Sequence, residues 1–321
     1  MTAIATEVPR LAPSDDGTAP DVPREPPRVS IGLPVYNGED YLAQAVDSIL
    51  AQEYADFELV VSDNGSTDAT EAICREYASR DPRIRYHREE RNRGAAWNFN
   101  HVVRMARGEF FRWACHDDAI SPSHLRRCVE VLEDAPPSVV LAYTRSVLVD
   151  ADGNAVGTFE DGLDTRGMPP HERFRLVARR LRYTHVLYGL IRREALMGTR
   201  LLGAYESSDN VLVAELSLAG EFVEIPAYLF RRRIHARMSR KANTSARSVA
   251  QWFDPSADAR FYFPHARLFG EYTRAVWRAP LARGERMRTA LALRHWARRE
   301  VRPFILGVLS PVLRHSPATS Q

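Results

Sequence analysis

The strongest constraint on the fold is an alternation of apolar runs with helical patterns in the first third of the chain. Short apolar runs, which are typical of buried strands, occupy residues 29–33, 57–62, 84–86 and 109–114. Between these runs, apolar residues recur at the spacing of an amphipathic helix. Strands and helices in alternation predict an α/β fold with a mainly parallel, Rossmann-like sheet flanked by helices.

A polar cluster follows each predicted strand of this sheet. The clusters are Tyr36 with Asn37, Asp63 with Asn64, Asn92-Arg93-Gly94, and Asp117 with Asp118. In open α/β sheets, ligands bind beyond the carboxyl ends of the strands. We therefore expect the four clusters to lie together and to form one binding site.

The rest of the chain is less regular, and it divides the protein into three parts. The patterns predict a strand over 139–149, a loop or hairpin over 150–170, a helix over 206–218, and strands interrupted by Pro226 over 222–234. From about residue 254 the pattern is helical and rich in arginine. We expect a disordered leader over 1–27, a main domain over 28–240 and a helical, basic extension over 241–321.

Composition excludes several classes of protein. A formal net charge of +3 over 321 residues gives no reason to expect nucleic acid as a partner. The three cysteines are too few and too scattered for a disulfide framework. The sequence also lacks the pattern of a secretory signal and any apolar stretch long enough to span a membrane. We therefore expect a cytoplasmic protein.

Asp117 and Asp118 end the fourth predicted strand and are the first candidates for chemistry. Adjacent carboxylates at a strand end repel each other unless a cation or a hydrogen-bond donor lies between them. Mg²⁺ is usually bound by a few carboxylates together with substrate phosphates. The alternative is a plain loop in which Asp118 caps a helix that begins at Ser121.

Four further positions each allow two interpretations. Asp63 belongs either to a turn or to a site where it accepts a hydrogen bond from a nucleobase. Residues 92–94 form either a solvated turn or a phosphate-binding helix N-terminus. Glu206 and Asp209 either cap a helix or supply an acid–base group. His235, which follows three arginines, is either structural or part of a phosphate or metal site.

These motifs recur in a fixed order, which is Val29-Ser-Ile-Gly-Leu-Pro-Val-Tyr-Asn37, residues 62–68, Asn92-Arg-Gly94, His116-Asp-Asp118, and residues 187–192, 208–209 and 233–235. Their order and spacing resemble those of family 2 glycosyltransferases of the GT-A fold, over roughly residues 28–240. The resemblance implies an inverting enzyme that moves a hexose or deoxyhexose from a UDP- or dTDP-sugar to an acceptor hydroxyl. It also implies a place in polysaccharide, glycolipid or cell-envelope glycan synthesis.

The resemblance implies a role for each matching residue. The donor would be bound by Pro34, Tyr36, Asn37, Asp63, Asn64, Arg93, Gly94, Asn98 and Asp117. Asp117 and His235 would hold a divalent cation, Mg²⁺ or Mn²⁺, and Asp118 is a further candidate ligand. Asp209 matches the acid that serves as general base and would be the catalytic residue.

Two departures from the family pattern keep other functions open. Cys115 replaces the first acid of the metal motif, and Ser208 replaces the glutamate that precedes the base. A non-catalytic nucleotide-sugar-binding protein would tolerate both changes. A sugar nucleotidyltransferase is the second alternative, but residues 34–40 hold no basic side chain to grip a triphosphate.

The C-terminal extension carries eight arginines between residues 278 and 302, opposed by Glu285 and Glu300. An apolar segment follows at 304–313. A basic helix beside an apolar one can lie on an anionic membrane surface, here over 278–313. The alternative is a helical appendage that packs on the main domain with a solvated basic face. A membrane position would suit a glycan or lipid-linked acceptor at the inner face of the cell membrane.

Overall fold

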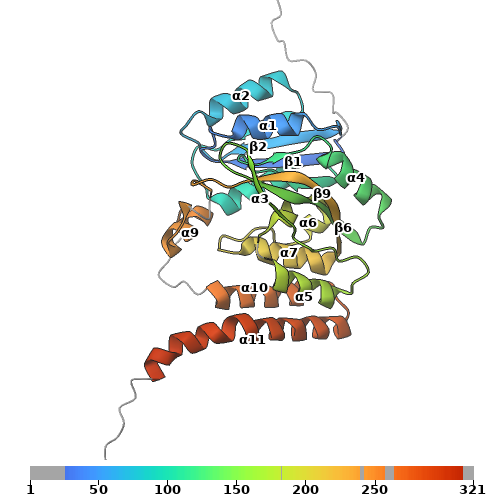
Figure 1. The fold of residues 1–321 in the computed structure, drawn as a ribbon, viewed down its shortest axis with the longest axis vertical. Coiled ribbons are helices and arrows are strands. Elements are labelled where there is room, and N and C mark those ends of the chain that lie inside the picture. The colour runs from blue at the N-terminus through green and yellow to red at the C-terminus, as the bar shows by residue number, and fades with distance from the viewer. Residues whose placement is uncertain (1–25, 182, 239–241, 257–263, 314–321) are drawn as a thin grey trace, which may run out of the picture.

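The computed structural model describes residues 26–181, 183–238, 242–256 and 264–313 (Figure 1). The leader predicted over 1–27 therefore lies almost wholly outside the described residues. A nine-stranded sheet runs in the order β3-β2-β1-β4-β8-β6-β9-β5, with β7 paired to β6. Helices pack on both faces of this sheet, so the predicted α/β fold with a helical C-terminal extension is confirmed.

The first half of the sheet is parallel, as predicted. Its strands are β1 (Val29–Val35), β2 (Phe57–Asp63), β3 (Ile84–Arg88) and β4 (Phe110–Trp113). The connections are α1 (Leu42–Leu50), α2 (Thr70–Arg80) and α3 (Ala95–Met105). Figure 1 shows α1 and α2 on one face of the sheet and α3 on the other. Every residue of β1 and β2 is buried, as expected for parallel strands covered on both faces.

The second half of the sheet is mixed, which differs from the mainly parallel sheet that the sequence predicts. Its strands are β5 (Ala119–Ile120), β6 (Val139–Val149), β7 (Ala155–Phe159), β8 (Leu190–Arg192) and β9 (Glu221–Arg233). β8 runs antiparallel to both β4 and β6, while β6 and β9 are parallel. β7 returns along β6 as a hairpin, and β5 pairs antiparallel with β9.

β9 is one strand, although the sequence predicts an interruption at Pro226. Its pairing with β6 shifts register between Ile225 and Tyr228, so that Pro226 and its neighbour bulge out of the ladder. Pro226 is exposed there. A bulge lets a strand keep a residue that has no N–H to donate. The strand therefore continues to Arg233 and brings its last residues to the end of β4.

The remaining helices stack below the sheet in Figure 1 or cover its ends. They are α4 (His124–Asp134), α5 (Pro170–Arg180), the short 3₁₀ helix η1 (His185–Tyr188), α6 (Arg193–Met197), α7 (Ser208–Ala219), α9 (Ala246–Phe253), α10 (Pro264–Arg278) and α11 (Arg283–Leu313). Tyr272 of α10 and Leu293 of α11 share one buried core with Phe174 of α5. The beginning of the extension thus packs on the main domain. No described helix is long and apolar enough to cross a membrane.

A buried acidic pair ties the β7 hairpin to β9. Glu224 of β9 accepts hydrogen bonds from the Tyr143 hydroxyl at 2.7 Å and from the Gly162 N–H at 2.9 Å. Asp161 lies beside it, and burial together with the negative charge of Glu224 raises the pKa of Asp161 to about 7. Its carboxyl group is therefore partly protonated near neutral pH.

Replacing Asp161 with Asn is expected to stabilise the protein above neutral pH. The pKa of Asp161 is higher in the folded than in the unfolded protein, so the stability that it contributes is complete below about pH 4 and declines as the pH rises toward 7. The amide of an asparagine cannot ionise, so in Asp161→Asn the free energy of unfolding should rise by about 2 kcal/mol at pH ~8. Thermal unfolding of the wild type and of Asp161→Asn at pH ~4 and at pH ~8 measures this difference in stability. An equal gain in the free energy of unfolding at both pH values would contradict the prediction.

Candidate active site

The loops after β1 and β2 are joined by hydrogen bonds. Asn37, whose φ of 50° lies in the left-handed region, donates its N–H to Ser66 Oγ at 2.9 Å. The Asn37 Oδ1 accepts the N–H of Thr67, also at 2.9 Å. The first two polar clusters therefore form one unit, in which Asn37 shapes the loop.

Asn64 joins this unit to the third cluster. Its amide nitrogen donates to Asn92 Oδ1 at 2.9 Å and to the Gly94 carbonyl at 3.2 Å. Its Oδ1 accepts the N–H of Arg93 at 3.0 Å. Because Asn64 is buried, these bonds hold the N-terminus of α3 beside the first two loops. Free N–H groups at a helix N-terminus favour a phosphate ligand.

Asp63 lies at the predicted edge, at the end of β2, but it is fully buried. Its Oδ1 accepts the N–H of Ser66 at 2.8 Å, and its Oδ2 accepts the Tyr86 hydroxyl at 2.9 Å. Arg88 lies 3.5 Å from the same oxygen. Contact between Asp63 and a nucleobase would therefore require an exchange with Tyr86 or Arg88.

The other donor candidates divide into supporting and exposed residues. The amide nitrogen of Asn98 donates to the carbonyls of Val35 and Ser62 at 3.2 and 3.0 Å, which holds the ends of β1 and β2 together. Pro34 is buried within β1, whereas Tyr36 is exposed just beyond it. Of the donor candidates Pro34, Tyr36 and Asn98, Tyr36 therefore has the exposed aromatic ring that can stack on a ligand.

Gly94 lies beneath the C-terminal part of the chain. Its φ is 88°, and a Cβ atom there would lie 2.3 Å from the carbonyl oxygen of Phe253 and 2.9 Å from Pro255 Cδ. Only glycine fits such a position. The neighbouring Arg93 stacks on Trp97, 4.0 Å from the ring centroid. The end of α9 thus helps to shape the third cluster, although the sequence analysis placed it outside the main domain.

Asp117 and His235 meet beyond the end of β4. His235 Nε2 contacts Asp117 Oδ2 at 3.0 Å, and both side chains are almost wholly buried. Burial acts to raise the pKa of Asp117, but the hydrogen bond with His235 and the surrounding positive charges hold it well below its usual range. A carboxylate and an imidazole this close fit as two ligands of one divalent cation. The chemistry of the pair therefore fits the predicted metal ligands.

Asp118 is less suited to a metal than Asp117. Its Oδ1 accepts the backbone N–H of Arg233 at 2.9 Å, and its Oδ2 pairs with Arg232 at 2.5 Å. Burial raises the pKa of Asp118, and the charge of Arg232 opposes that effect. Because both oxygens bind protein groups, Asp118 supports the strand end and is the weaker metal candidate of the two. It also does not cap α4, which begins at His124.

Cys115 completes a group whose ligand atoms, with those of Asp117 and Asp118, lie within 4.8 Å of one another. Burial raises the pKa of the Cys115 thiol well above its ordinary value. The thiol donates a hydrogen bond to the Tyr188 hydroxyl at 3.1 Å. A protonated thiol is a poor ligand for a hard cation, so Cys115 links β4 to η1 instead.

Asp209 lies in the first turn of α7 and is partly exposed. Its Oδ2 accepts the Thr184 hydroxyl at 2.8 Å, and its Oδ1 accepts the N–H of Asn210 at 2.9 Å. Thr184 immediately precedes η1, and Tyr188 at the other end of η1 contacts Cys115. A 3₁₀ helix rises about 2 Å per residue, so η1 separates these contacts by roughly 8 Å. Glu206 lies outside α7 and is exposed.

Arg233 has a structural role that the sequence pattern did not predict. This side chain is buried, and its Nε donates to the Asp117 carbonyl at 3.0 Å. It also bonds the Ala151 carbonyl at 2.7 Å, contacts Gln44 and lies 4.5 Å from the Tyr41 ring centroid. A buried guanidinium needs such partners. A run of arginines at the end of a buried strand is a signal that could have identified it.

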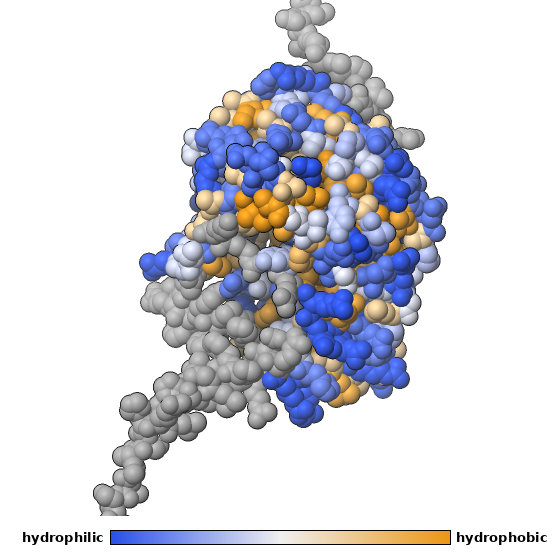
Figure 2. Space-filling model, in the orientation of Figure 1, coloured by the Kyte–Doolittle hydropathy of each residue, from blue (hydrophilic) through white to orange (hydrophobic). Residues whose placement is uncertain are grey.

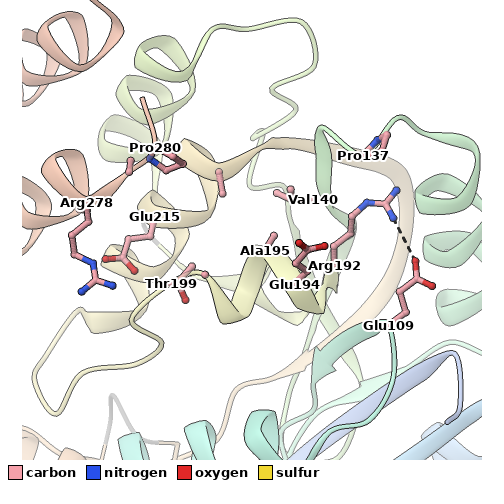
Figure 3. Close-up of a pocket in the computed structure, with 14 residues that line it drawn as sticks. Glu109, Pro137, Val140, Arg192, Glu194, Ala195, Thr199, Glu215, Arg278 and Pro280 are labelled. Carbon is pink, nitrogen blue, oxygen red and sulfur yellow. Dashed lines mark ion pairs between the residues drawn. The ribbon is translucent and has the colours of Figure 1, made fainter. Parts of the chain in front are cut away.

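A cavity of about 520 Å³ lies at the ends of the strands opposite to the polar clusters, near the start of β4 and β6 (Figure 3). It is lined by Glu109 at the start of β4, by Pro137 just before β6, and by Arg192, Glu215 and Arg278. Glu109 and Arg192 form an ion pair at 3.8 Å. Because the polar clusters lie at the opposite ends of these strands, this cavity is separate from the candidate site.

The fold, the three joined loops and the adjoining Asp117–His235 pair are those expected of a glycosyltransferase of the GT-A type, and comparison with known proteins places the chain in a family. The family model of glycosyl transferase family 2 matches residues 30–197, which is more than half of the chain. The chain therefore belongs to glycosyl transferase family 2, a family of enzymes that transfer glycosyl groups.

Curated relatives match about 40% of the chain. An uncharacterized glycosyltransferase of Rickettsia typhi is 34% identical over 130 residues, which are 40% of this chain and 40% of that protein. Chondroitin synthase of Escherichia coli is 34% identical over 131 residues, 40% of this chain and 19% of that protein. The match thus spans less than half of the length of these relatives.

Solved structures share the fold at low sequence identity. TarS of S. aureus in complex with UDP-GlcNAc aligns with a TM-score of 0.60 and 16% identity, over 83% of this chain and 71% of that chain. A mannosyltransferase of Pyrobaculum calidifontis in complex with GDP-Man and Mn²⁺ aligns with a TM-score of 0.50 and 20% identity, over 91% and 82%. At these identities the similarity shows the fold alone.

Proposed function

We propose that this family 2 glycosyltransferase inverts the anomeric carbon as it moves a hexose or deoxyhexose from a UDP- or dTDP-sugar to an acceptor hydroxyl. The observation that carries the proposal is the contact between Asp117 and His235 beside three loops that Asn37 and Asn64 join into one edge. The solved relatives in complex with UDP-GlcNAc and with GDP-Man and Mn²⁺ support a nucleotide-sugar donor and a divalent ion.

The donor would lie along the joined loops. The exposed ring of Tyr36 would stack on the base, and the N-terminus of α3, which follows Arg93 and Gly94, would receive a phosphate at the N–H groups of its first turn. Asp63 and Asn98 would hold the strand ends in register. A divalent cation, Mg²⁺ or Mn²⁺ held by Asp117 and His235, would supply positive charge beside the leaving diphosphate.

Asp209 would act as the general base. It takes the proton of the acceptor hydroxyl while the hydroxyl oxygen bonds to the anomeric carbon. The bond from that carbon to the diphosphate breaks, and its electron pair leaves with the nucleoside diphosphate. The hydrogen bonds from Thr184 and Asn210 hold the Asp209 carboxylate in one orientation.

The basic extension supports a proposal for the acceptor and for the location of the protein. We place the enzyme in the cytoplasm, in peripheral contact with the inner face of the cell membrane through residues 278–313. A glycan or lipid-linked acceptor of polysaccharide, glycolipid or cell-envelope glycan synthesis would be met there. The exposed arginines and apolar side chains of α11 support this placement.

A donor screen tests the proposal. Thermal unfolding with UDP- and dTDP-sugars, in the presence of Mn²⁺ or Mg²⁺, should show a higher midpoint with one donor, because that donor binds the folded state. The same donor should release free nucleoside diphosphate. A shift with no release would instead identify a non-catalytic nucleotide-sugar-binding protein. Pyrophosphate release from a nucleoside triphosphate and a sugar phosphate would identify a nucleotidyltransferase.

A further inference from the structure

A second groove, also of about 520 Å³, runs between α5 and α11, far from the joined loops. One wall carries His171, Arg175, Ala178 and Arg179, which follow one another at helical spacing along α5. The other wall carries Arg288, Leu291, Ala292, His295 and Trp296 of α11. Trp296 is buried and packs edge-on against Tyr272 at 5.1 Å, so this wall is anchored in the core.

The positive charge of the α5 wall is poorly neutralised within the protein. Arg175 is 4.0 Å from Glu172, and exposed pairs of this kind contribute little. The side chain of Arg179 makes no hydrogen bond or ion pair with any residue that the structure describes. Arg175 and Arg179 lie one helical turn apart, where like charges destabilise a helix. An anion between the two guanidinium groups would remove this repulsion.

On the α11 wall, the carboxylate nearest to the basic side chains already pairs with groups of the protein. Glu285 bonds His171 at 2.6 Å and lies 3.4 Å from Arg288. Its side chain is largely buried, so it stays behind the groove surface. The opening of the groove therefore presents positive charge, and Figure 2 shows hydrophilic side chains gathered over α5.

Large apolar side chains are exposed on α11 and on the adjoining α10. Leu291 in the groove is 50% exposed, Met287 one turn before it is 57% exposed, and Trp277 of α10 is 58% exposed. A soluble anion would be bound by the arginines alone and would gain nothing from these side chains. Arginines beside exposed Leu, Met and Trp are typical of surfaces that lie at the headgroup level of a bilayer.

We propose that the groove between α5 and α11 binds the phosphate headgroups of anionic phospholipids. The inference rests on the membrane contact in the proposed function and names the residues that make it, Arg175 and Arg179 with Arg288 opposite. Neither arginine of α5 belongs to the segment 278–313 from which membrane contact was first predicted. Leu291 and Met287 then enter the boundary between headgroups and acyl chains.

Vesicle co-sedimentation of the full chain tests the groove. The wild-type protein should bind vesicles that contain phosphatidylglycerol and should not bind pure phosphatidylcholine vesicles. In the double variant Arg175→Glu/Arg179→Glu, affinity for the anionic vesicles should fall by at least about tenfold, since each basic residue near the surface contributes on the order of 1 kcal/mol. Both side chains are exposed, so the variant should unfold at the wild-type temperature.

The matched control is Arg75→Glu/Arg80→Glu on α2, which changes the net charge equally at the opposite end of the molecule. Its vesicle binding should equal that of the wild type. An equal loss of vesicle affinity in both double variants would contradict the proposal that the groove binds anionic lipid. Binding that inorganic pyrophosphate abolishes at low concentration would identify a soluble-anion site instead of a lipid surface. Turnover with a soluble acceptor should be unchanged in Arg175→Glu/Arg179→Glu, so failure of catalysis and failure of docking give different results.

Discussion

Replacement of Asp209 by Asn is expected to lower kcat by about 100- to 10,000-fold, the usual contribution of a general base. Asn has the shape of Asp and can still accept the Thr184 hydroxyl, so the first turn of α7 should keep its structure. It cannot take a proton at neutral pH. Donor affinity should be unchanged, because Asp209 contacts Thr184 and Asn210 and lies outside the joined loops.

Release of nucleoside diphosphate measures kcat, and calorimetry measures donor affinity. Thr184→Val is the matched control, because it keeps the carboxylate but removes one hydrogen bond that orients it. We expect a much smaller loss of kcat in that variant. Normal turnover by Asp209→Asn would exclude Asp209 as the base, whereas weaker donor binding would assign it to the donor site.

Replacement of Asp117 by Asn is expected to weaken Mn²⁺ binding and to lower kcat/KM by at least about 100-fold. An amide oxygen carries no net charge, so it compensates poorly for a divalent cation. The backbone should be little affected, since Arg233 bonds the Asp117 carbonyl and not its carboxylate. Calorimetry with Mn²⁺ alone reads out the site independently of activity.

Asp118→Asn is the control that separates metal binding from stability. Asp118 pairs with Arg232 in the interior, and breaking a buried pair costs about 3–5 kcal/mol. This variant should unfold at a lower temperature and, where it remains folded, should still bind Mn²⁺. Asp117→Asn should instead lose Mn²⁺ binding under conditions where it is folded. Full activity after dialysis against EDTA, with Asp117→Asn as active as the wild type, would refute the metal proposal.

The first half of the fold could be predicted from sequence because local patterns decide it. Buried parallel strands read as continuous apolar runs, and β1 and β2 match this description. β5 and β8 could not be predicted in the same way, since strands of two and three residues have no period to detect. They exist because tertiary neighbours pair with them. β8 also reverses direction, which makes the second half of the sheet mixed.

The candidate site could likewise be predicted only where local sequence patterns decide its position. The strand-end rule placed Asn37, Asp63, Asn64 and Asp117 at one edge, and the structure brings their loops together. It could not show that Asp63 is covered by Tyr86, because that contact depends on the packing of β3 beside β2. The contact of α9 with Gly94 was equally hidden, since 159 residues separate Gly94 from Phe253.

β9 lies late in the chain, so the part of the site that it supplies can fold only after the donor loops have been synthesised. Arg232, Arg233 and His235 reach β4 only after the chain has closed a loop of more than a hundred residues. Contacts between such distant positions form slowly, because the entropy of loop closure opposes them. During synthesis, the donor loops can therefore fold while Asp117 still lacks its partner. Any metal ion held by Asp117 and His235 would then be bound only after β9 has paired with β6.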